Sequence, residues 1–469
     1  MFFSNLSHEF KLIYRSSWFL ILFSSIGLLF LFATFNGKKN VEKRLNDILK
    51  VQEEFQKKDL QLIETLKKIE SGEDSENPYW RSPSDPMTIG SQHPRLALMH
   101  PGNFSFLAIG QSDMFTHFKS PTIYGNNFAL DYSEMINPIQ LLFGNFDLAF
   151  AIIYILPLLI ISFTYNILSK EKELGTLRLL SSQPISTMDW LFQKTLIRFI
   201  FFVVISLVLL LSIIAYFFLD SYKDKLSLIG LVVLVISYNL FWFVLAFIVN
   251  IKINNSSKNA ISLIGIWLFI VLVIPATINQ IGNSLYPAPS RLKMINEIRL
   301  IKKENEEAQN KIMDEYLRTH PELAKESDKD KFGFWHNYFA SEKEMENKTK
   351  PLLTQYDTQL KKQQDLIYIF KFLSPAILMH QSFNNIAGTS EKHYNDYKKQ
   401  VFQFSEKWRN YLVPMLFKNQ KFSLNNYNEL PNFKYENRIL GNVWSSIFIL
   451  NSISFIILIF FLRRNLKFI

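Results

Sequence analysis

Apolar residues in this chain gather in a few long windows that contain almost no charge. Each window is about 19 residues or longer, enough at ~1.5 Å per residue to cross a ~30 Å hydrocarbon layer as a helix. Six windows fit this description: roughly Ser17–Phe35, Phe146–Leu168, Leu196–Leu219, Leu226–Ile251, Ala260–Ile281 and Val443–Leu462. The pattern predicts an α-helical polytopic membrane protein with six transmembrane helices. Pro157 and Pro275 lie inside such windows, where a helix tolerates them if neighbouring groups satisfy the freed carbonyls.

Two long polar regions, about 36–145 and 282–442, separate the windows. The first opens with apolar residues in a seven-residue register from Val41 to Ile69, which predicts a long amphipathic or coiled helix. After Ser71, Pro and Gly recur and predict irregular structure with short strands. Apolar strips at helical spacing predict a mainly helical second region.

Charges beside the windows predict the orientation, because cytoplasmic segments are enriched in Lys and Arg. With a cytoplasmic N-terminus, the inside segments are 1–16, 169–195, 252–259 and 463–469. They hold eleven cations against four anions, which is +7 of the total +10. Four cations just after the first window oppose this assignment locally, but the sum favours cytoplasmic N- and C-termini.

This orientation divides the chain into five predicted parts. They are 1–35, the cytoplasmic N-terminus and first span; 36–145, extracytoplasmic domain 1; 146–281, spans two to five with the cytoplasmic segment 169–195; 282–442, extracytoplasmic domain 2; and 443–469, the sixth span and cytoplasmic tail.

Composition removes several chemistries. The 469 residues are 48% hydrophobic, with 44 Phe and no Cys. Disulfides, thiolate zinc sites and Cys nucleophiles are therefore absent. Because most of the positive excess lies beside membrane windows, we expect a lipid membrane and no nucleic acid as partner.

The segment between the second and third windows, KEKELGTLRLLSSQPIS from Lys170 to Ser186, carries the main functional signal. Leu174, Leu177 and Leu180 recur at a spacing of three and could lie together in the membrane interface. Glu171, Glu173 and Arg178 would then face water or a partner. The alternative is an ordinary charged loop between spans.

This segment resembles the coupling-helix region of ABC-2 type transporter permeases. The matching residues are Glu171, Glu173, Gly175, Thr176, Leu177, Leu179, Leu180 and Pro184. The resemblance implies a short helix along the cytoplasmic membrane face that docks onto a separate ATP-binding subunit. The candidate ATPase-coupling residues are Glu171, Glu173, Leu174, Gly175, Thr176, Leu177, Arg178, Leu180 and Pro184.

Other motifs resemble a subgroup of these permeases that has two large extracytoplasmic insertions of unknown function. They include Asn77-Pro78-Tyr79-Trp80, Gly110-Gln111-Ser112-Asp113, Tyr286-Pro287-Ala288-Pro289, His320-Pro321-Glu322-Leu323 and Ser374-Pro375-Ala376-Ile377-Leu378. The resemblance implies two permease subunits, identical or paralogous, above two copies of an ABC ATP-binding subunit. It names no substrate.

Missing motifs limit what the chain can do alone. It contains no GxxxxGK[ST] string, so we expect no enzyme activity and no cofactor in this chain, with ATP and Mg²⁺ bound by the partner ATPase. The windows hold no ionisable residue near their centres, which argues against ion coupling. We therefore expect the permease subunit of an ABC exporter in a bacterial inner membrane. The alternatives are an ATP-driven mechanical transmitter that passes no substrate, and a passive scaffold.

Six soft ligands cluster within 31 residues of the first polar region: Met87, His93, Met99, His100, Met114 and His117. Imidazole and thioether groups bind copper. Their spacing matches no fixed metal motif, and a loop histidine is commonly just hydrogen-bonded. We expect no metal site and keep these six as the candidates.

Overall fold

The computed structural model of this protein describes residues 11, 15, 17–73, 82–110, 112, 116–124, 146–177, 186–288, 290–307, 316, 318, 334–437 and 443–465. The described chain is mostly helical. Its α-helices are α2 (Ser17–Glu70), α3 (Pro86–Gln92), α5 (Leu148–Phe150), α6 (Leu156–Thr164), α7 (Ser169–Glu173), α9 (Thr187–Phe217), α10 (Lys225–Lys252), α11 (Ser256–Leu268), α12 (Ile274–Leu285), α13 (Arg291–Glu307), α16 (Phe334–Phe370), α17 (Pro375–Ala387), α18 (Glu391–Phe417), α19 (Leu424–Glu429) and α20 (Val443–Asn465). The shorter elements are π-helices η4 (Ala151–Ile155) and η6 (Phe269–Val273), 3₁₀-helices η5 (Leu219–Lys223) and η8 (Lys371–Leu373), and strands β1 (Ala97–Leu98) and β2 (Phe118–Lys119).

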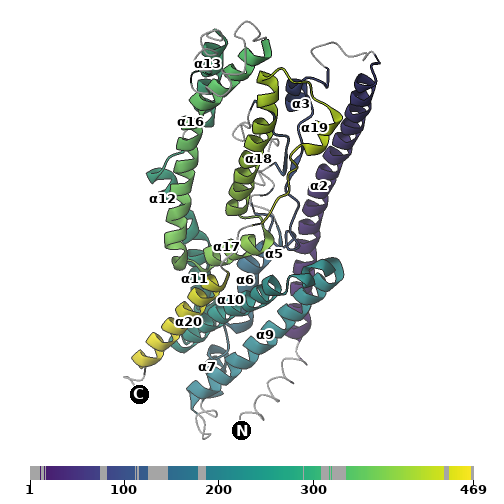
Figure 1. Ribbon diagram of the computed structural model, residues 1–469. Helices are drawn as coiled ribbons and strands as arrows, with labels where there is room; N and C mark the ends of the chain where they lie inside the picture. Colours follow the sequence, from purple (N-terminus) through teal and green to yellow (C-terminus); the bar gives the residue numbers. More distant parts are fainter. Residues whose placement is uncertain are drawn as a thin grey trace.

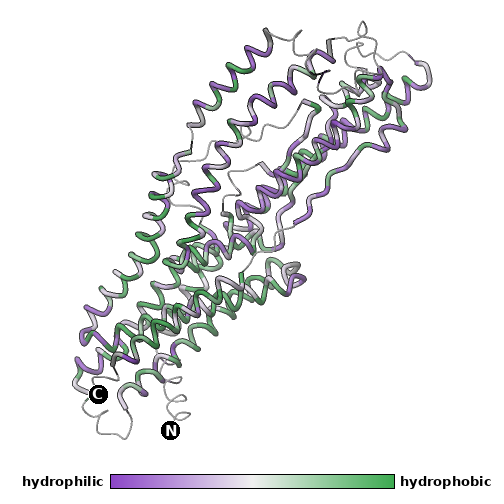
Figure 2. Tube along the Cα trace, turned by 60° about the vertical axis from the view of Figure 1, so that its left-hand side comes forward, coloured by the Kyte–Doolittle hydropathy of each residue, from purple (hydrophilic) through white to green (hydrophobic). Residues whose placement is uncertain are grey.

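Hydrophobic residues are concentrated in one half of the elongated molecule (Figure 2). In the described part of the chain, six helices are long and apolar enough to cross a membrane, and they coincide with the six predicted windows. The protein is therefore a multi-pass α-helical membrane protein. We call this half the span bundle. The other half, made of the described residues of 36–145 and 282–437, we call the polar lobe.

The first span does not end where its apolar window ends. Helix α2 continues unbroken for 54 residues and carries the chain from the bundle along the full side of the polar lobe (Figure 1). At ~1.5 Å per residue it is about 81 Å long. The predicted span and the predicted amphipathic helix are thus one element. No proline interrupts it, and Gly37 is compatible with helical backbone.

Both prolines inside spans follow a π-helical turn, and a hydroxyl from a neighbouring element satisfies a nearby carbonyl. Pro157 follows η4, and the Tyr238 hydroxyl donates to the Ile153 carbonyl at 2.7 Å. Pro275 follows η6, and the Ser374 hydroxyl donates to the Ile270 carbonyl at 2.7 Å. The expectation that neighbouring groups compensate for the prolines is confirmed.

Neutral polar residues inside the bundle differ in whether they are satisfied. The Asn451 amide donates to the Ser237 hydroxyl at 3.0 Å and so joins α20 to α10, as expected for a central polar pair. Asn239 on α10 is fully buried, yet neither polar atom of its side chain has a hydrogen-bond partner among the described residues.

The two polar regions share one hydrophobic core. Leu66 of α2, Met87 of α3 and Trp408 of α18 belong to the same buried cluster. The Trp408 indole also donates to the Gly90 carbonyl at 3.4 Å. The predicted short strands are present as the antiparallel pair β1 and β2, and the second region is mainly helical in its described part.

Helix α17 lies where the polar lobe meets the bundle (Figure 1). It packs against α10, α20 and both π-helices. Its buried residues Leu378 and Phe383 belong to the same core as the spans. Contacts with both proline-distorted spans make α17 a mechanical link between the lobe and the bundle.

A second link is the segment 102–110 of the first polar region. The Phe106 ring stacks on Phe218 at the end of α9, with centroids 3.6 Å apart and planes 4° from parallel. The buried Asp147 carboxylate caps α5 by accepting from the Phe150 amide at 2.7 Å, and it also accepts from the Ile109 amide at 2.8 Å. The segment is therefore fixed to two spans.

Candidate functional site

The second span ends in the short helix α7 at the end of the bundle opposite the polar lobe (Figure 1). The Leu174 amide still bonds the Lys170 carbonyl at 3.0 Å, but Gly175 takes a left-handed conformation with φ +73°. Glycine adopts this conformation at little cost and commonly terminates helices. The sequence E-L-G-T thus forms a helix end followed by a tight turn.

The predicted single apolar face from Leu174 to Leu180 is wrong in its described part. Because the helix stops at Glu173, Leu174 and Leu177 do not share a face. Leu174 is 65% exposed, whereas Leu177 packs against the buried cluster around Leu168 and Leu191. Arg178, Leu179, Leu180 and Pro184 lie outside the described residues.

Glu173 ties α7 to the beginning of α11. Its carboxylate accepts from the Ser256 amide at 2.7 Å and from the Ser256 hydroxyl at 2.9 Å. A carboxylate is favourable there because the N-terminus of a helix carries partial positive charge. The Ser169 and Ser256 hydroxyls lie 2.9 Å apart, which adds a second contact between the helices.

Glu171 ties α7 to α9. Its carboxylate lies 3.4 Å from the Lys194 ammonium, which also sits 4.4 Å from the centroid of the Trp190 ring. Thr176 closes the turn by donating to the Glu171 carbonyl at 3.1 Å and to its carboxylate. Glu171 therefore fixes the start of this turn to α9, and Thr176 fixes its end to Glu171.

Two buried asparagines lock the spans beneath α7. The Asn250 amide of α10 donates to the Thr164 and Ala246 carbonyls, each at 2.9 Å. The Asn259 amide of α11 donates to the Tyr165 carbonyl at 3.0 Å. Both asparagines are fully buried, so α6 is joined to α10 and α11 by desolvated hydrogen bonds.

These contacts leave a short exposed surface that is anchored to the neighbouring spans. Residues Glu173 to Thr176, here called the exposed turn, are all exposed. They present the Leu174 side chain and a helix end to any molecule below the bundle, whereas the Thr176 hydroxyl and the Glu173 carboxylate are engaged within the chain. Glu171, Glu173, Gly175, Thr176 and Leu177 all lie in or beside this turn, and their role in ATPase coupling stays a prediction.

Sequence reasoning missed the residues that anchor the exposed turn. Asn250, Ser256 and Asn259 lie 83 to 94 residues from their partners along the chain and belong to no recognised motif. One signal was available, since Asn and Ser at the edge of an apolar window often cap helices or bond backbone.

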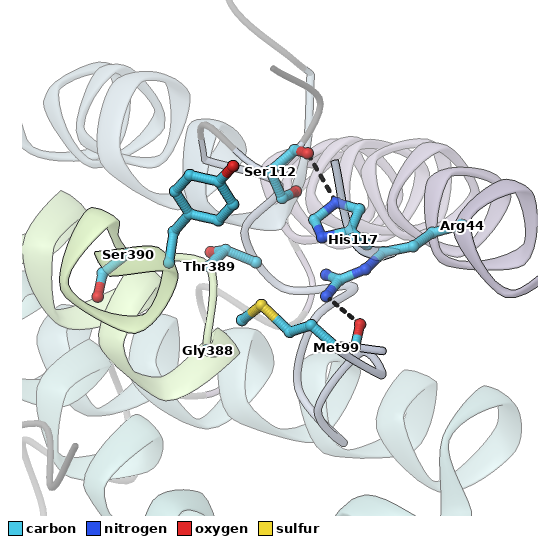
Figure 3. Close-up of a pocket in the computed structure, with 8 residues that line it drawn as sticks. Arg44, Met99, Ser112, His117, Gly388, Thr389 and Ser390 are labelled. Carbon is cyan, nitrogen blue, oxygen red and sulfur yellow. Dashed lines mark hydrogen bonds between the residues drawn. The ribbon is translucent and has the colours of Figure 1, made fainter. Parts of the chain in front are cut away.

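The soft ligands of the first polar region do not converge in the described chain. Met99 and His117 line one small cavity with Arg44, Ser112, Thr389 and other residues (Figure 3). Met87 instead lies in the core around Trp408, and Met114 is outside the described residues. No group of three or more His, Cys, Asp or Glu able to hold a metal occurs among the residues that the structure describes.

The small cavity suits an internal polar contact better than a cation. Arg44 donates to the Met99 carbonyl at 2.9 Å, and the His117 Nε2 lies 2.8 Å from the Ser112 carbonyl (Figure 3). Burial, together with the Arg44 charge, lowers the pKa of His117 to about 3. Its imidazole is therefore neutral near pH 7, but the adjacent guanidinium opposes a metal ion.

Comparison with known proteins finds a family match only for the second polar region. Residues 291–436 match the family model described as a domain of unknown function, DUF3526. This stretch runs from α13 to just beyond α19 and leaves out the exposed turn and the spans. No curated protein and no solved structure matches the chain.

Proposed function

We propose that this chain is the permease subunit of an ATP-driven ABC-type exporter in a bacterial inner membrane. The observation that carries the proposal is the exposed turn, a solvent-exposed surface that Glu173 and Thr176 anchor at the positively charged end of the bundle. In this proposal that end is cytoplasmic, both termini lie there, and the polar lobe is extracytoplasmic. The subunit pairs with a second permease, as a homodimer or with a paralogue.

The ATP-hydrolysing machinery belongs to a partner in this proposal. The sequence has no phosphate-binding loop, so two copies of a separate ATP-binding subunit supply ATP, Mg²⁺ and hydrolysis. Leu174 fits an apolar recess on that subunit. A push on the exposed turn reaches α9 through Glu171 and α11 through Glu173, so three spans move together.

Site-specific photo-crosslinking tests the docking surface. A photoreactive amino acid at Leu174 should capture, in intact cells, a chain that carries a GxxxxGK[ST] loop. Leu300 is a matched control because it is 61% exposed, against 65% for Leu174, but lies on α13 in the polar lobe. Capture of that chain from Leu300 as well, or of no nucleotide-binding chain from Leu174, contradicts the proposal.

A second test measures how far the chain, purified with the captured ATPase, stimulates ATP turnover. Leu174→Asp would bury a charge in the contact and should weaken stimulation of ATP turnover at least about tenfold. Leu300→Asp should leave it unchanged. Normal complex formation and normal stimulation by Leu174→Asp would show that the exposed turn is not the docking surface.

The continuity of α2 favours a second candidate function, an ATP-driven mechanical transmitter that passes no substrate. One 54-residue helix joins the first span to the core of the polar lobe, so tilting the span moves the lobe. ATP-dependent accumulation of a labelled compound in inverted vesicles argues for export. Lobe movement with no accumulation of any candidate compound argues for transmission.

A further inference from the structure

A cavity of about 240 Å³ opens on the side of the span bundle, between α9 and α20. α10 forms its floor, since Phe243 and Phe247 of that helix are buried while Phe192 of α9 and Phe455 of α20 are about half exposed at its edges. The lining residues are Phe192, Thr195, Leu196, Phe199, Leu240, Phe243, Val244, Phe247, Ser454, Phe455 and Leu458. We call this cavity the lateral pocket.

The lateral pocket has the size and depth of a lipid chain. An apolar cavity of about 150 Å³ holds a benzene ring, so this one accommodates a longer hydrocarbon. On α10 its lining runs from Phe247, near the end of the helix, to Leu240. At ~1.5 Å per residue, Leu240 lies about 18 Å from the end of α10 at Lys252, close to half of a ~30 Å hydrocarbon layer.

One polar group in the lateral pocket lacks a partner. Thr195 is only 6% exposed, and its hydroxyl has no hydrogen-bond partner among the described residues. Ser454, the other hydroxyl in the lining, already donates to the Leu450 carbonyl at 2.8 Å. A buried hydroxyl without a partner is costly, which indicates that a ligand atom completes it.

The depth of Thr195 selects the kind of ligand atom. It directly precedes the apolar stretch that begins at Leu196, so it lies at the edge of the hydrocarbon layer. The ester carbonyls of a phospholipid lie at this same edge, and each is an acceptor for a hydroxyl. An acyl chain below its ester group therefore fits Thr195 and the apolar wall together.

Charge at the pocket end of the bundle selects the headgroup. Lys252, which ends α10, is exposed, and its ammonium lies 5.5 Å from the centroid of the Phe461 ring of α20. Arg463 on α20 is also exposed. Cations beside a membrane attract anionic lipid headgroups.

We propose that the lateral pocket binds one acyl chain of an anionic phospholipid, with the Thr195 hydroxyl donating to the ester carbonyl and Lys252 facing the headgroup. The site is complete within one chain, so it needs neither a second subunit nor an ATPase.

Photolabelling of the full chain in lipid nanodiscs tests the site. The probe is phosphatidylglycerol with a diazirine in its acyl chain, diluted in phosphatidylcholine. Labelled peptides should come from α9, α10 and α20 together. Unlabelled phosphatidylglycerol should suppress the labelling at lower concentration than added phosphatidylcholine.

Two variants and two matched controls define the result. Val244→Trp fills the lateral pocket and should reduce its labelling at least tenfold. Val208→Trp, at a 54% exposed site on α9 outside the pocket, should not. Thr195→Val should lower affinity about fivefold, the effect of one hydrogen bond. Thr277→Val should have no effect, because that exposed hydroxyl already donates to the Val273 carbonyl.

Two outcomes overturn the proposal. One is labelling of the pocket that is no stronger than labelling around Val208, or that persists in Val244→Trp. The other is occupancy by a second copy of this chain. The sequence has no Cys, so Phe455→Cys gives a clean test, and an efficient disulfide dimer in membranes would show that a protein covers the pocket.

Discussion

A single methyl group at Gly37 should loosen the joint between the span bundle and the polar lobe. Gly37 lies on α2 just beyond the first apolar window. A Cβ there would lie 2.1 Å from the Phe106 carbonyl oxygen, where ordinary contact begins near 3.4 Å. The helix or the segment must therefore move by about 1.3 Å to accommodate Gly37→Ala.

The segment that carries Phe106 has little room to retreat. The Phe106 ring is stacked on Phe218, and the Leu107 carbonyl accepts from the Ala149 amide at 2.9 Å. Because the clash is with fixed backbone, we expect the upper end of the overpacking range, about 3 kcal/mol. Better helix propensity of Ala offsets about 1 kcal/mol. The net loss of unfolding free energy should be about 2 kcal/mol.

Gly265→Ala is the matched control, since Gly265 is also within a span helix and has nothing within 4 Å of its added Cβ. It should be neutral or stabilise the protein by up to about 1 kcal/mol. Both variants can be unfolded by titrating SDS into mixed micelles with helicity as the signal. If Gly37→Ala is as stable as wild type, the close approach of α2 to the segment is not a constraint.

Three further outcomes are expected. In the same micelle assay, Asn250→Leu should lower the unfolding free energy by about 1–3 kcal/mol, because the Thr164 carbonyl loses its buried donor. Asn239→Leu removes an unsatisfied amide on the same helix, so it should be neutral or stabilising. Equal losses for the two variants would refute the distinction. Burial raises the pKa of Glu346, but hydrogen bonding from Lys343 and the charge of Arg409, whose Nη1 lies 2.7 Å from the carboxylate, outweigh it and leave the pKa below the usual 4.5. The carboxylate therefore stabilises the folded lobe above pH 4.5, and this stabilisation is lost as the pH falls through the lowered pKa of Glu346. Thermal unfolding measured from pH 7 to 3 should show a loss of stability in acid that is smaller in Glu346→Gln. An unchanged pH profile in that variant would contradict the assignment.

The coarse architecture followed from the sequence because membrane burial is a one-dimensional constraint. A helix that crosses a bilayer needs an uninterrupted apolar window, and all six windows correspond to helices. The backbone requirements of the prolines could also be predicted from the sequence. The prolines inside spans required outside donors, and the structure supplies them from Tyr238 and Ser374.

Relations between distant segments were decided only by the tertiary structure. The sequence gives no reason for Tyr238 to meet the Ile153 carbonyl or for Glu173 to cap α11, because those contacts depend on which spans are neighbours. The expected face of Leu174 and Leu177 failed for a local and a tertiary reason: the left-handed Gly175 redirected the chain, and packing against distant residues then buried only the second leucine.

The sequence by itself determined that the protein has six membrane spans and where their apolar windows lie, since these depend on local hydrophobicity. Tertiary structure decided that α2 runs unbroken from the bundle into the lobe, that the two polar regions share one core, and that an apolar cavity with one unsatisfied hydroxyl opens beside α10. Such features arise from packing between residues far apart in the chain, and no local pattern encodes them.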